Sequence, residues 1–438
     1  LYNYVEIRKT LEDKGYIFET GSDTEVLLKS YDFYGVDCLE KFEGMWSFVI
    51  YDEVENTFFM SRDRFGEKPF YYFLDKKNFV FGSEIKFIKN IIQKELPINE
   101  DYLKRFLVLG HKALYKNSEC SFYKGIQELQ PGELAFFRGG KLTKKRYWSP
   151  NVSIDNTFER SYWVKETRDK LIKSVELRMR ADVPLSFCLS GGVDSGSLVS
   201  IASKTLGKKV HTFSIIDSDD RYNEEAQIDS VIKDTGCESI KIRLDKSDYF
   251  DDLYSLSDYR NGPVATCSYF VHSLLIDQIN SRGFKIGMSG VGADEIFTGY
   301  FDHFSFYLKH IKDKSIFQKS LKEWNLHVSH LIRNPLITNL GRFYEGGYRE
   351  HIYLNSDKFN QYFNKSQDLS FVETLYTKES ELRNRMLNEL FNEVVRVILH
   401  QDDMNSMFYS VENRSPFLDR DLFEMSTKIP TEYLINKG

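Results

Sequence analysis

Apolar positions in the first 150 residues alternate between helical and strand-like spacing. Residues 5–16 and 25–35 repeat apolar side chains every three or four positions, which predicts two helices that each end at a glycine. Short runs rich in aromatic and β-branched residues predict strands; they are 45–52, 57–63, 69–75 and 79–84. Residues 129–148 predict a further hairpin with a Gly-Gly turn. The pattern indicates antiparallel sheet with helices packed on it.

A polar, unpatterned linker at about 149–160 separates this part from a stretch in which strands and helices alternate. Four apolar runs predict strands, namely 183–192, 208–216, 238–244 and 284–290. Helical patterns precede and separate them, at 162–180, 195–207, 224–236 and 269–283. This alternation is typical of a parallel sheet with crossover helices. The pattern from about 301 is mostly helical, so we expect two domains, 1–150 and 160–438.

Composition excludes several classes of function. Hydrophobic residues make up 41% of the 438 residues and charged residues 28%, as in soluble globular proteins. The 59 basic and 65 acidic side chains leave a net charge of −6, which argues against a general nucleic-acid binder. No apolar run approaches the roughly 20 residues that span a bilayer, and no signal peptide is visible. Five scattered cysteines without a CxxC pair indicate reduced thiols and a cytoplasmic location.

The stretch PLSFCLSGGVDSGSLVSIA contains a candidate phosphate-binding loop. An apolar run ends in Ser190, Gly191 and Gly192, and a helical pattern resumes at Asp194 and Ser195. Glycines let backbone N–H groups approach an anion, and a helix N-terminus and serine hydroxyls add to the attraction. The loop lacks the lysine of a Walker A motif. A carboxylate beside phosphates implies an intervening metal, most simply Mg²⁺, so this interpretation outweighs that of a plain capped glycine turn.

These residues resemble the pyrophosphatase loop of enzymes that split ATP into AMP and pyrophosphate. The whole chain resembles the class B, glutamine-hydrolysing asparagine synthetases. HTFSI resembles their adenine-lining strand, SGVGADEIFTGY their second phosphate and substrate loop, and MNSMFYSVENRSPFLD the helical signature of their synthetase domain. LYNYVEIRKTLEDKGYIFETGSDTEVLL, GMWSFVIYD and SRDRFGEKPFYY resemble their glutaminase domain. The resemblance implies a partial α+β glutaminase domain of the N-terminal nucleophile type, followed by an α/β ATP pyrophosphatase domain with a parallel sheet.

The resemblance also implies which residues bind ATP and Mg²⁺. The ATP-binding residues would be Cys188, Leu189, Ser190, Gly191, Gly192, Asp194, Ser195, Ile215, Ser289 and Gly290. Of these, Cys188, Leu189 and Ile215 would wall the adenine, while Ser289 and Gly290 would bind the ribose or the α-phosphate through their backbone. Asp194 and Asp294 would coordinate Mg²⁺, since two carboxylates from separate loops suit a hard cation.

The same resemblance implies catalytic roles for four residues, Asp194, Asp294, Glu295 and Arg414. It implies that Asp23 binds glutamine. A carboxylate suits the α-ammonium group of an amino acid. The residue types alone also allow plainer roles. Asp294 would serve as a helix N-cap, Arg414 as one partner of a structural ion pair, and Asp23 as a turn or cap residue. The sequence leaves these alternatives open.

The implied reaction is amide synthesis that consumes ATP. A substrate carboxylate attacks the α-phosphate of ATP, and the loop amides stabilise the charge on the leaving pyrophosphate. Ammonia then attacks the acyl-adenylate and AMP leaves. In the family, ammonia comes from glutamine hydrolysed in the front domain and passes through an internal channel. The expected partners are therefore ATP, glutamine, and aspartate or another carboxylate, with no nucleic acid and no membrane; a homodimer is compatible with this scheme.

Three departures from the family pattern change the expectation. Family members begin with a nucleophilic cysteine, whereas this chain begins at Leu1 and none of its five cysteines matches that position, so these residues should not hydrolyse glutamine. Val291 stands where asparagine synthetases usually carry an acid that helps to form the aspartyl-adenylate. The chain also ends at Gly438, before the family's catalytic lysine. We therefore expect a fragment that is truncated at both ends.

Three hypotheses follow. The first is a glutamine-dependent synthetase that converts aspartate to asparagine. The second is the same chemistry on another carboxylate, such as a sugar uronic acid in surface polysaccharide assembly, because the apolar Val291 would suit a larger acceptor. The third is a nucleotide-binding regulator without catalysis. Asp194 and Asp294 argue against the third, because binding alone hardly needs two metal-binding acids.

Overall fold

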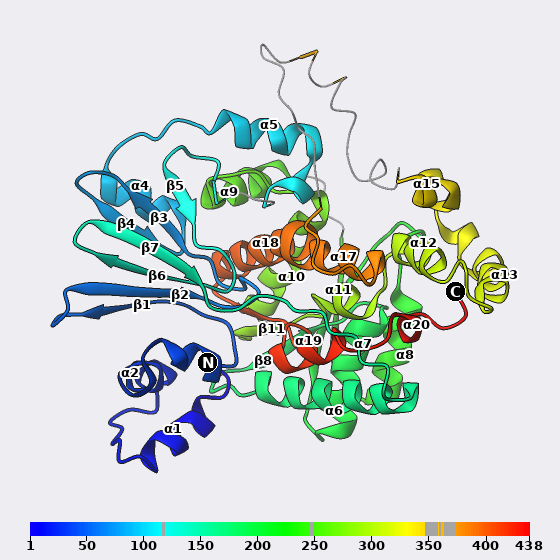
Figure 1. The fold of residues 1–438 in the computed structure, drawn as a ribbon, viewed down its shortest axis with the longest axis horizontal. Helices are drawn as coiled ribbons and strands as arrows, with labels where there is room; N and C mark the ends of the chain where they lie inside the picture. Colours follow the sequence, from blue (N-terminus) through cyan, green and yellow to red (C-terminus); the bar gives the residue numbers. More distant parts are fainter. Residues whose placement is uncertain (116–118, 245–248, 347–357, 359–360, 363–372) are drawn as a thin grey trace.

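The computed structural model places antiparallel sheets in the N-terminal part of the chain and a parallel sheet in the C-terminal part (Figure 1). This confirms the predicted fold class, α+β followed by α/β. The strands of the N-terminal part lie on the left in Figure 1, and most C-terminal helices lie on the right. The structure describes the whole chain apart from residues 116–118, 245–248, 347–357, 359–360 and 363–372.

Two antiparallel sheets form the framework of residues 1–148. One has the strand order β1-β2-β6-β7 and the other β4-β3-β5. Their bounds are β1 (Ser47–Asp52), β2 (Thr57–Arg62), β3 (Tyr71–Leu74), β4 (Phe79–Gly82), β5 (Ile126–Glu128), β6 (Glu133–Arg138) and β7 (Lys141–Arg146). The predicted hairpin is present, and Gly139 and Gly140 have φ values of 57° and 77° at its turn. A two-residue turn with positive φ at both positions matches the twist of the paired strands.

Three helices pack against one face of the four-stranded sheet, namely α1 (Tyr4–Glu12), α2 (Asp23–Tyr34) and α3 (Cys38–Lys41), of which the first two were predicted. Helix α4 (Ile85–Ile92) packs against β3 and β4 of the three-stranded sheet, and α5 (Glu100–Leu109) follows it. The Ser22 hydroxyl caps α2 by accepting a hydrogen bond from the Thr24 N–H at 3.1 Å. Leu11 and Val26 are fully buried against Phe59 of the sheet. The buried apolar faces of α1 and α2 therefore fix these helices beside β1 and β2.

A five-stranded, wholly parallel sheet organises the C-terminal part, with the order β10-β9-β8-β11-β12. Its strands are β8 (Leu185–Cys188), β9 (His211–Ile216), β10 (Glu238–Arg243), β11 (Ile286–Met288) and β12 (Glu412–Arg414). The first four were predicted. The fifth was not, because the sequence suggested that all of 404–419 belongs to a helical signature. In the structure the helix ends at Phe408, and three residues of this stretch pair with β11 instead.

Helices cover the parallel sheet and build the end of the chain. Helix α6 (Arg160–Arg178) precedes the first strand, and the next helices along the chain are α7 (Val193–Ser200), α8 (Glu225–Thr235), α9 (Phe250–Arg260), α10 (Cys267–Ser281) and α11 (Ala293–Phe297). The later ones are α12 (Phe301–His310), α13 (Phe317–His327), α14 (Pro335–Thr338), α15 (Leu340–Glu345), α17 (Glu381–Asn388), α18 (Val394–Phe408), α19 (Arg420–Ser426) and α20 (Thr431–Leu434). None of the described helices has the length and apolar character needed to cross a membrane.

The strand order places a topological switch point beside β8. The chain runs from β8 to β9 and β10 on one side and then returns to β11 on the other side. In open parallel sheets, ligands bind beyond the carboxyl ends of the strands at such a point, because the connecting segments diverge there and leave a crevice. The loops that follow β8 and β11 carry most of the residues predicted to bind ATP.

The two parts of the chain share a buried interface. Phe65 of the N-terminal part enters the apolar core of the C-terminal part, where its ring lies 6.1 Å from that of Phe391 and 5.7 Å from that of Phe423. Lys68 pairs with Asp403 of α18 at 2.8 Å. Helix α18, which carries Asp403, lies beside the N-terminal part (Figure 1). Both parts of the chain therefore position α18.

Candidate active site

The Ser-Gly-Gly loop leaves β8 and folds back on the first turn of α7. The N–H of Ser190 donates to the Ser195 hydroxyl at 3.0 Å, and the N–H of Gly192 donates to the Ser190 hydroxyl at 3.2 Å. The two hydroxyl oxygens lie 2.9 Å apart. The serines therefore shape the loop from within, and the loop stands at the N-terminus of α7, where the helix dipole favours an anion.

Close approach explains why glycines stand in both loops. A Cβ on Gly191 would lie 2.8 Å from the Cβ atoms of Glu224 and Gln227. A Cβ on Gly290, in the loop after β11, would lie 3.0 Å from the Cβ of Asp194. The two loops are thus in contact through Gly290 and Asp194, and any larger side chain would push them apart.

A cavity of about 390 Å³ opens between these loops. Eight of the ten residues predicted to bind ATP line it, namely Cys188, Leu189, Ser190, Asp194, Ser195, Ile215, Ser289 and Gly290. These residues come from three segments that are distant in the sequence. The other two predicted residues, Gly191 and Gly192, belong to the loop at its edge. Apolar side chains and polar loop atoms thus face one space, as in a nucleotide site.

Asp194 and Asp294 lie close enough to influence each other. Burial and the Asp294 carboxylate raise the pKa of Asp194 to about 6. Burial also raises the pKa of Asp294, whose side chain lies directly against Gly299. Two partly buried acids that resist joint ionisation favour a cation between them. Mg²⁺ binding by this pair stays a prediction; of the two acids, Asp194 lines the cavity and Asp294 is not among its described lining residues.

Glu295 points into the protein rather than into the cavity. The Tyr300 hydroxyl donates to its carboxylate at 2.6 Å, and burial raises its pKa to about 7. Of Glu295, only 2% is exposed. The structure therefore places this predicted catalytic residue behind the loop that carries Asp294, where it fixes Tyr300.

A buried ionic network supports the same loop from α17. Asp302, His303 and Glu389 lie close enough to share a metal ion. Arg385 already pairs with Glu389 at 2.7 Å and with Asp302 at 3.2 Å, and His303 lies 2.6 Å from Glu389. The N–H of Gly299 donates to His303 at 3.2 Å. The arginine supplies the positive charge that a metal would bring, so the cluster orders the 298–303 segment.

Arg414 does not reach this cavity, contrary to the expectation that it faces the substrate site. Its guanidinium pairs with Glu412 at 2.6 Å and donates to the carbonyl oxygens of Arg178 and Arg180 at 2.6 Å and 2.7 Å. These partners hold it in the wall of another cavity, of about 830 Å³, between the two parts of the chain. The alternative role as a structural ion pair describes its surroundings.

Asp23 lines that second cavity together with Arg414. It is the first residue of α2, but Ser22 and not Asp23 caps the helix. Asp23 therefore lies at the cavity wall, and its role in glutamine binding stays a prediction.

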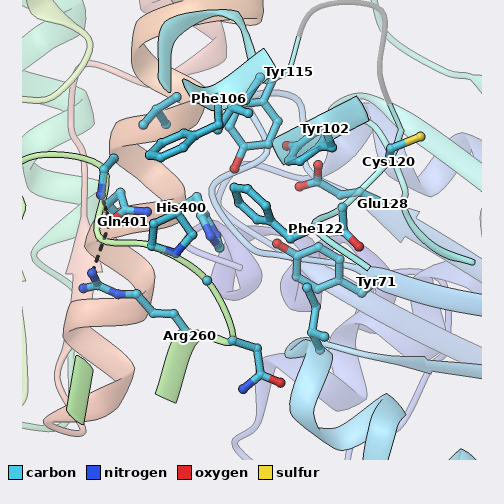
Figure 2. Close-up of a pocket in the computed structure, with 18 residues that line it drawn as sticks. Tyr71, Tyr102, Phe106, Tyr115, Cys120, Phe122, Glu128, Arg260, His400 and Gln401 are labelled. Atoms are coloured by element: carbon cyan, nitrogen blue, oxygen red, sulfur yellow. Dashed lines mark hydrogen bonds between the residues drawn. The ribbon is translucent and has the colours of Figure 1, made fainter. Parts of the chain in front are cut away.

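A third, enclosed cavity of about 40 Å³ lies between the two parts of the chain (Figure 2). Glu128 and Tyr71 face it from the N-terminal part, and His400, Gln401 and Arg260 face it from the C-terminal part. None of the predicted site residues lines it. The space admits about one water-sized molecule, so we do not assign the substrates to it.

Three lining residues of the nucleotide-type cavity were missed by the sequence analysis, namely Glu224, His272 and the apolar Leu275. Glu224 stands at the start of α8, and His272 lies on α10. His272 Nδ1 lies 3.1 Å from an oxygen of Asp402 on α18. Although burial disfavours the charged imidazole, Asp402 raises the pKa of His272 to about 10. None of the three belongs to a local motif, so only the folded structure brings them to the site.

A parallel sheet with a glycine loop at its switch point, preceded by antiparallel sheets, is the arrangement expected of a synthetase domain joined to an amidotransferase-type domain. Comparison with family models supports both parts: the asparagine synthase model matches residues 166–438, and the glutamine amidotransferase domain model matches 1–148. The chain belongs to the asparagine synthase family, as its motifs predicted.

Relatives of known name agree with this membership. The chain is 29% identical over 460 residues to glutamine-hydrolysing asparagine synthetase 1 of Bacillus subtilis, across 100% of this chain and 70% of that protein. It is 30% identical over 328 residues to glutamine-hydrolysing asparagine synthetase 3 of the same organism, across 68% of this chain and 50% of that protein. The chain thus spans between half and seven-tenths of the length of these relatives.

Proposed function

We propose that the protein makes an amide from aspartate, with glutamine and ATP consumed and asparagine, glutamate, AMP and pyrophosphate formed. One observation carries the proposal: residues assigned separately to adenine and phosphate binding, and Asp194 of the two acids assigned to the metal, converge on a single cavity at the switch point of the sheet. Family membership supports the general chemistry of amide formation driven by ATP. The geometry supports the assignment of individual residues.

The cavity suggests how this chain would activate the acceptor. Cys188, Leu189 and Ile215 would enclose the adenine, and Ser289 and Gly290 would face the ribose or the α-phosphate. The acceptor carboxylate attacks the α-phosphorus, and the bond to the bridging oxygen of pyrophosphate breaks. N–H groups of the loop at the start of α7 then hold the departing negative charge. Mg²⁺ bound by Asp194 and Asp294 would neutralise part of that charge.

Amide formation follows at the acyl-adenylate. Ammonia attacks its carbonyl carbon, loses a proton, and AMP departs with the electrons of the broken C–O bond. We propose that residues 1–150 are the glutaminase domain that supplies ammonia and that 160–438 are the synthetase domain. The cavity beside Asp23 supports glutamine binding there, and no cysteine is among the described residues that line it.

Val291 bears on the identity of the acceptor. Its side chain is half-buried and packs against the apolar core. Val291 supplies no carboxylate where the resemblance implies an acid that helps to form the aspartyl-adenylate. This favours, as a second candidate, the same reaction on another carboxylate, such as a larger sugar uronic acid. The five cysteines form no disulfide, which supports the proposed cytoplasmic location.

Pyrophosphate release in the presence of ammonium distinguishes the two acceptors. The full-length protein would be given ATP, Mg²⁺ and ammonium, with aspartate in one series and uronic acids in another. Release with aspartate and formation of asparagine would support the first proposal. Release with a uronic acid alone would replace aspartate but keep the mechanism, and release with neither would remove both acceptors.

A further inference from the structure

A carboxylate already occupies part of the loop proposed to bind phosphate. The N–H of Gly191 donates a hydrogen bond of 2.9 Å to Oε2 of Glu224, which comes from the residue before α8. Glu224 also lines the 390 Å³ cavity. Its oxygen therefore holds the position that a phosphoryl oxygen would take at this N–H group.

The other N–H groups of the loop have partners from the loop itself. Those of Ser190 and Gly192 donate to serine hydroxyls. Only the Gly191 N–H, among these three, meets an acid from another segment. A hydroxyl can rotate to donate to an incoming phosphate, but a carboxylate can only accept. Glu224 must release Gly191 before a phosphate can bind there.

Packing keeps Glu224 beside the loop. A Cβ on Gly191 would lie 2.8 Å from the Cβ of Glu224 and 3.3 Å from its carboxyl carbon. The stem of the side chain thus contacts the backbone of Gly191, and only rotation of the carboxylate frees the N–H group. Since Glu224 is exposed, water can receive the displaced carboxylate.

Charge in the cavity adds to this competition. Asp194 and Glu224 both line the cavity, and His272 is the single basic side chain among its described lining residues. A polyphosphate that enters meets two carboxylates, one of which Mg²⁺ would neutralise. Glu224 would remain as an opposing charge at the end of the cavity formed by the glycine loop.

We propose that Glu224 is a built-in competitor of pyrophosphate for the Gly191 amide. It weakens the binding of this product and so favours its release after ATP is cleaved. This inference rests on the proposed function of the loop. Glu224 does not bind the phosphates itself. It gives up the hydrogen bond from the Gly191 N–H group, and a phosphate oxygen then accepts that hydrogen bond.

Binding of Mg²⁺-pyrophosphate, measured by titration calorimetry, tests the inference without turnover. We expect Glu224→Gln and Glu224→Ala each to tighten this binding about threefold to tenfold, the effect of one exposed hydrogen bond to a charged group. Glu225→Gln is the matched control, because the neighbouring Glu225 pairs with Lys241 and Arg243 instead of the loop. Its affinity for pyrophosphate should equal that of the unaltered protein.

Each other outcome rejects the inference. Unchanged or weaker binding in both Glu224 variants, with normal binding by the unaltered protein, overturns the role of Glu224 but leaves the phosphate loop in place. Equal tightening in Glu225→Gln would show a general effect of charge, which also overturns it. Failure of the unaltered protein and of all variants to bind either pyrophosphate or ATP would overturn the proposed function of the loop as well. Circular dichroism checks that each variant is folded.

Discussion

Removal of the Glu128 carboxylate should destabilise both parts of the chain together. Glu128 lies between Arg62 of β2 at 2.7 Å and Arg396 of α18 at 3.0 Å. The exposed fractions of Glu128, Arg62 and Arg396 are 3%, 5% and 6%, so water cannot replace the lost partner. Although burial opposes ionisation of Glu128, the two arginines hold its pKa below the usual range. The glutamate is therefore charged at neutral pH and balances two buried cations.

The size of the effect follows from this burial. Breaking a buried ion pair by removing one partner costs about 3–5 kcal/mol, because a charge remains buried without compensation. In Glu128→Gln both arginines lose their counter-charge, so we expect a loss of at least about 3 kcal/mol in the free energy of unfolding. The remaining hydrogen bonds of Arg62 to three backbone carbonyls limit the loss.

Urea unfolding followed by tryptophan fluorescence measures this loss. Glu55→Gln is a suitable control, because Glu55 pairs with Arg138 at 2.9 Å while the two side chains are 57% and 65% exposed. Exposed pairs contribute under about 1 kcal/mol. A Glu128→Gln variant that is no less stable than Glu55→Gln would refute the reasoning, since the burial of the network would then have no energetic consequence.

Three further predictions concern the candidate active site. Val291→Glu should raise kcat/KM for aspartate in the pyrophosphate-release assay if this position governs acceptor activation, and an unchanged value would remove that role. Gly290→Ala should lower kcat about 10- to 100-fold, because the Cβ of the alanine would lie 3.0 Å from the Cβ of Asp194 and displace the loop that carries Asp194. Circular dichroism should show an intact fold, and normal turnover would contradict the close approach of the two loops. His272→Gln should lower the melting temperature most below about pH 6.5 and progressively less as the pH rises through about 10, because Asp402 raises the folded-state pKa of His272. A drop in melting temperature that does not depend on pH would mean that the His272–Asp402 pair carries no charge.

Local motifs made the loop residues predictable from the sequence. Ser190 to Ser195 and Ser289 to Asp294 each follow a short apolar strand, and the carboxyl ends of parallel strands meet at one edge of a sheet. The pattern predicted the strands and helices, and the family resemblance implied that the two loops share one site. The switch point beside β8 was not predicted, because local spacing does not determine the order of strands in a sheet.

Residues fixed by long-range packing were not predictable. The direction of Arg414 depends on β12, a three-residue strand that the sequence pattern could not separate from the preceding helix. Glu224 reaches the loop because α8 packs beside α7, and His272 meets Asp402 because α10 packs on α18. Such contacts join side chains that are far apart in the sequence, and no local spacing encodes them.

The products formed from ATP test the central claim most directly. With Mg²⁺, ammonium and the accepted carboxylate, we expect the full-length protein to form AMP and pyrophosphate in equal amounts, and Asp194→Asn to form neither while it remains folded. ADP and phosphate as products, or normal turnover by Asp194→Asn, would contradict the claim that the cavity between the loops after β8 and β11 is where ATP is cleaved.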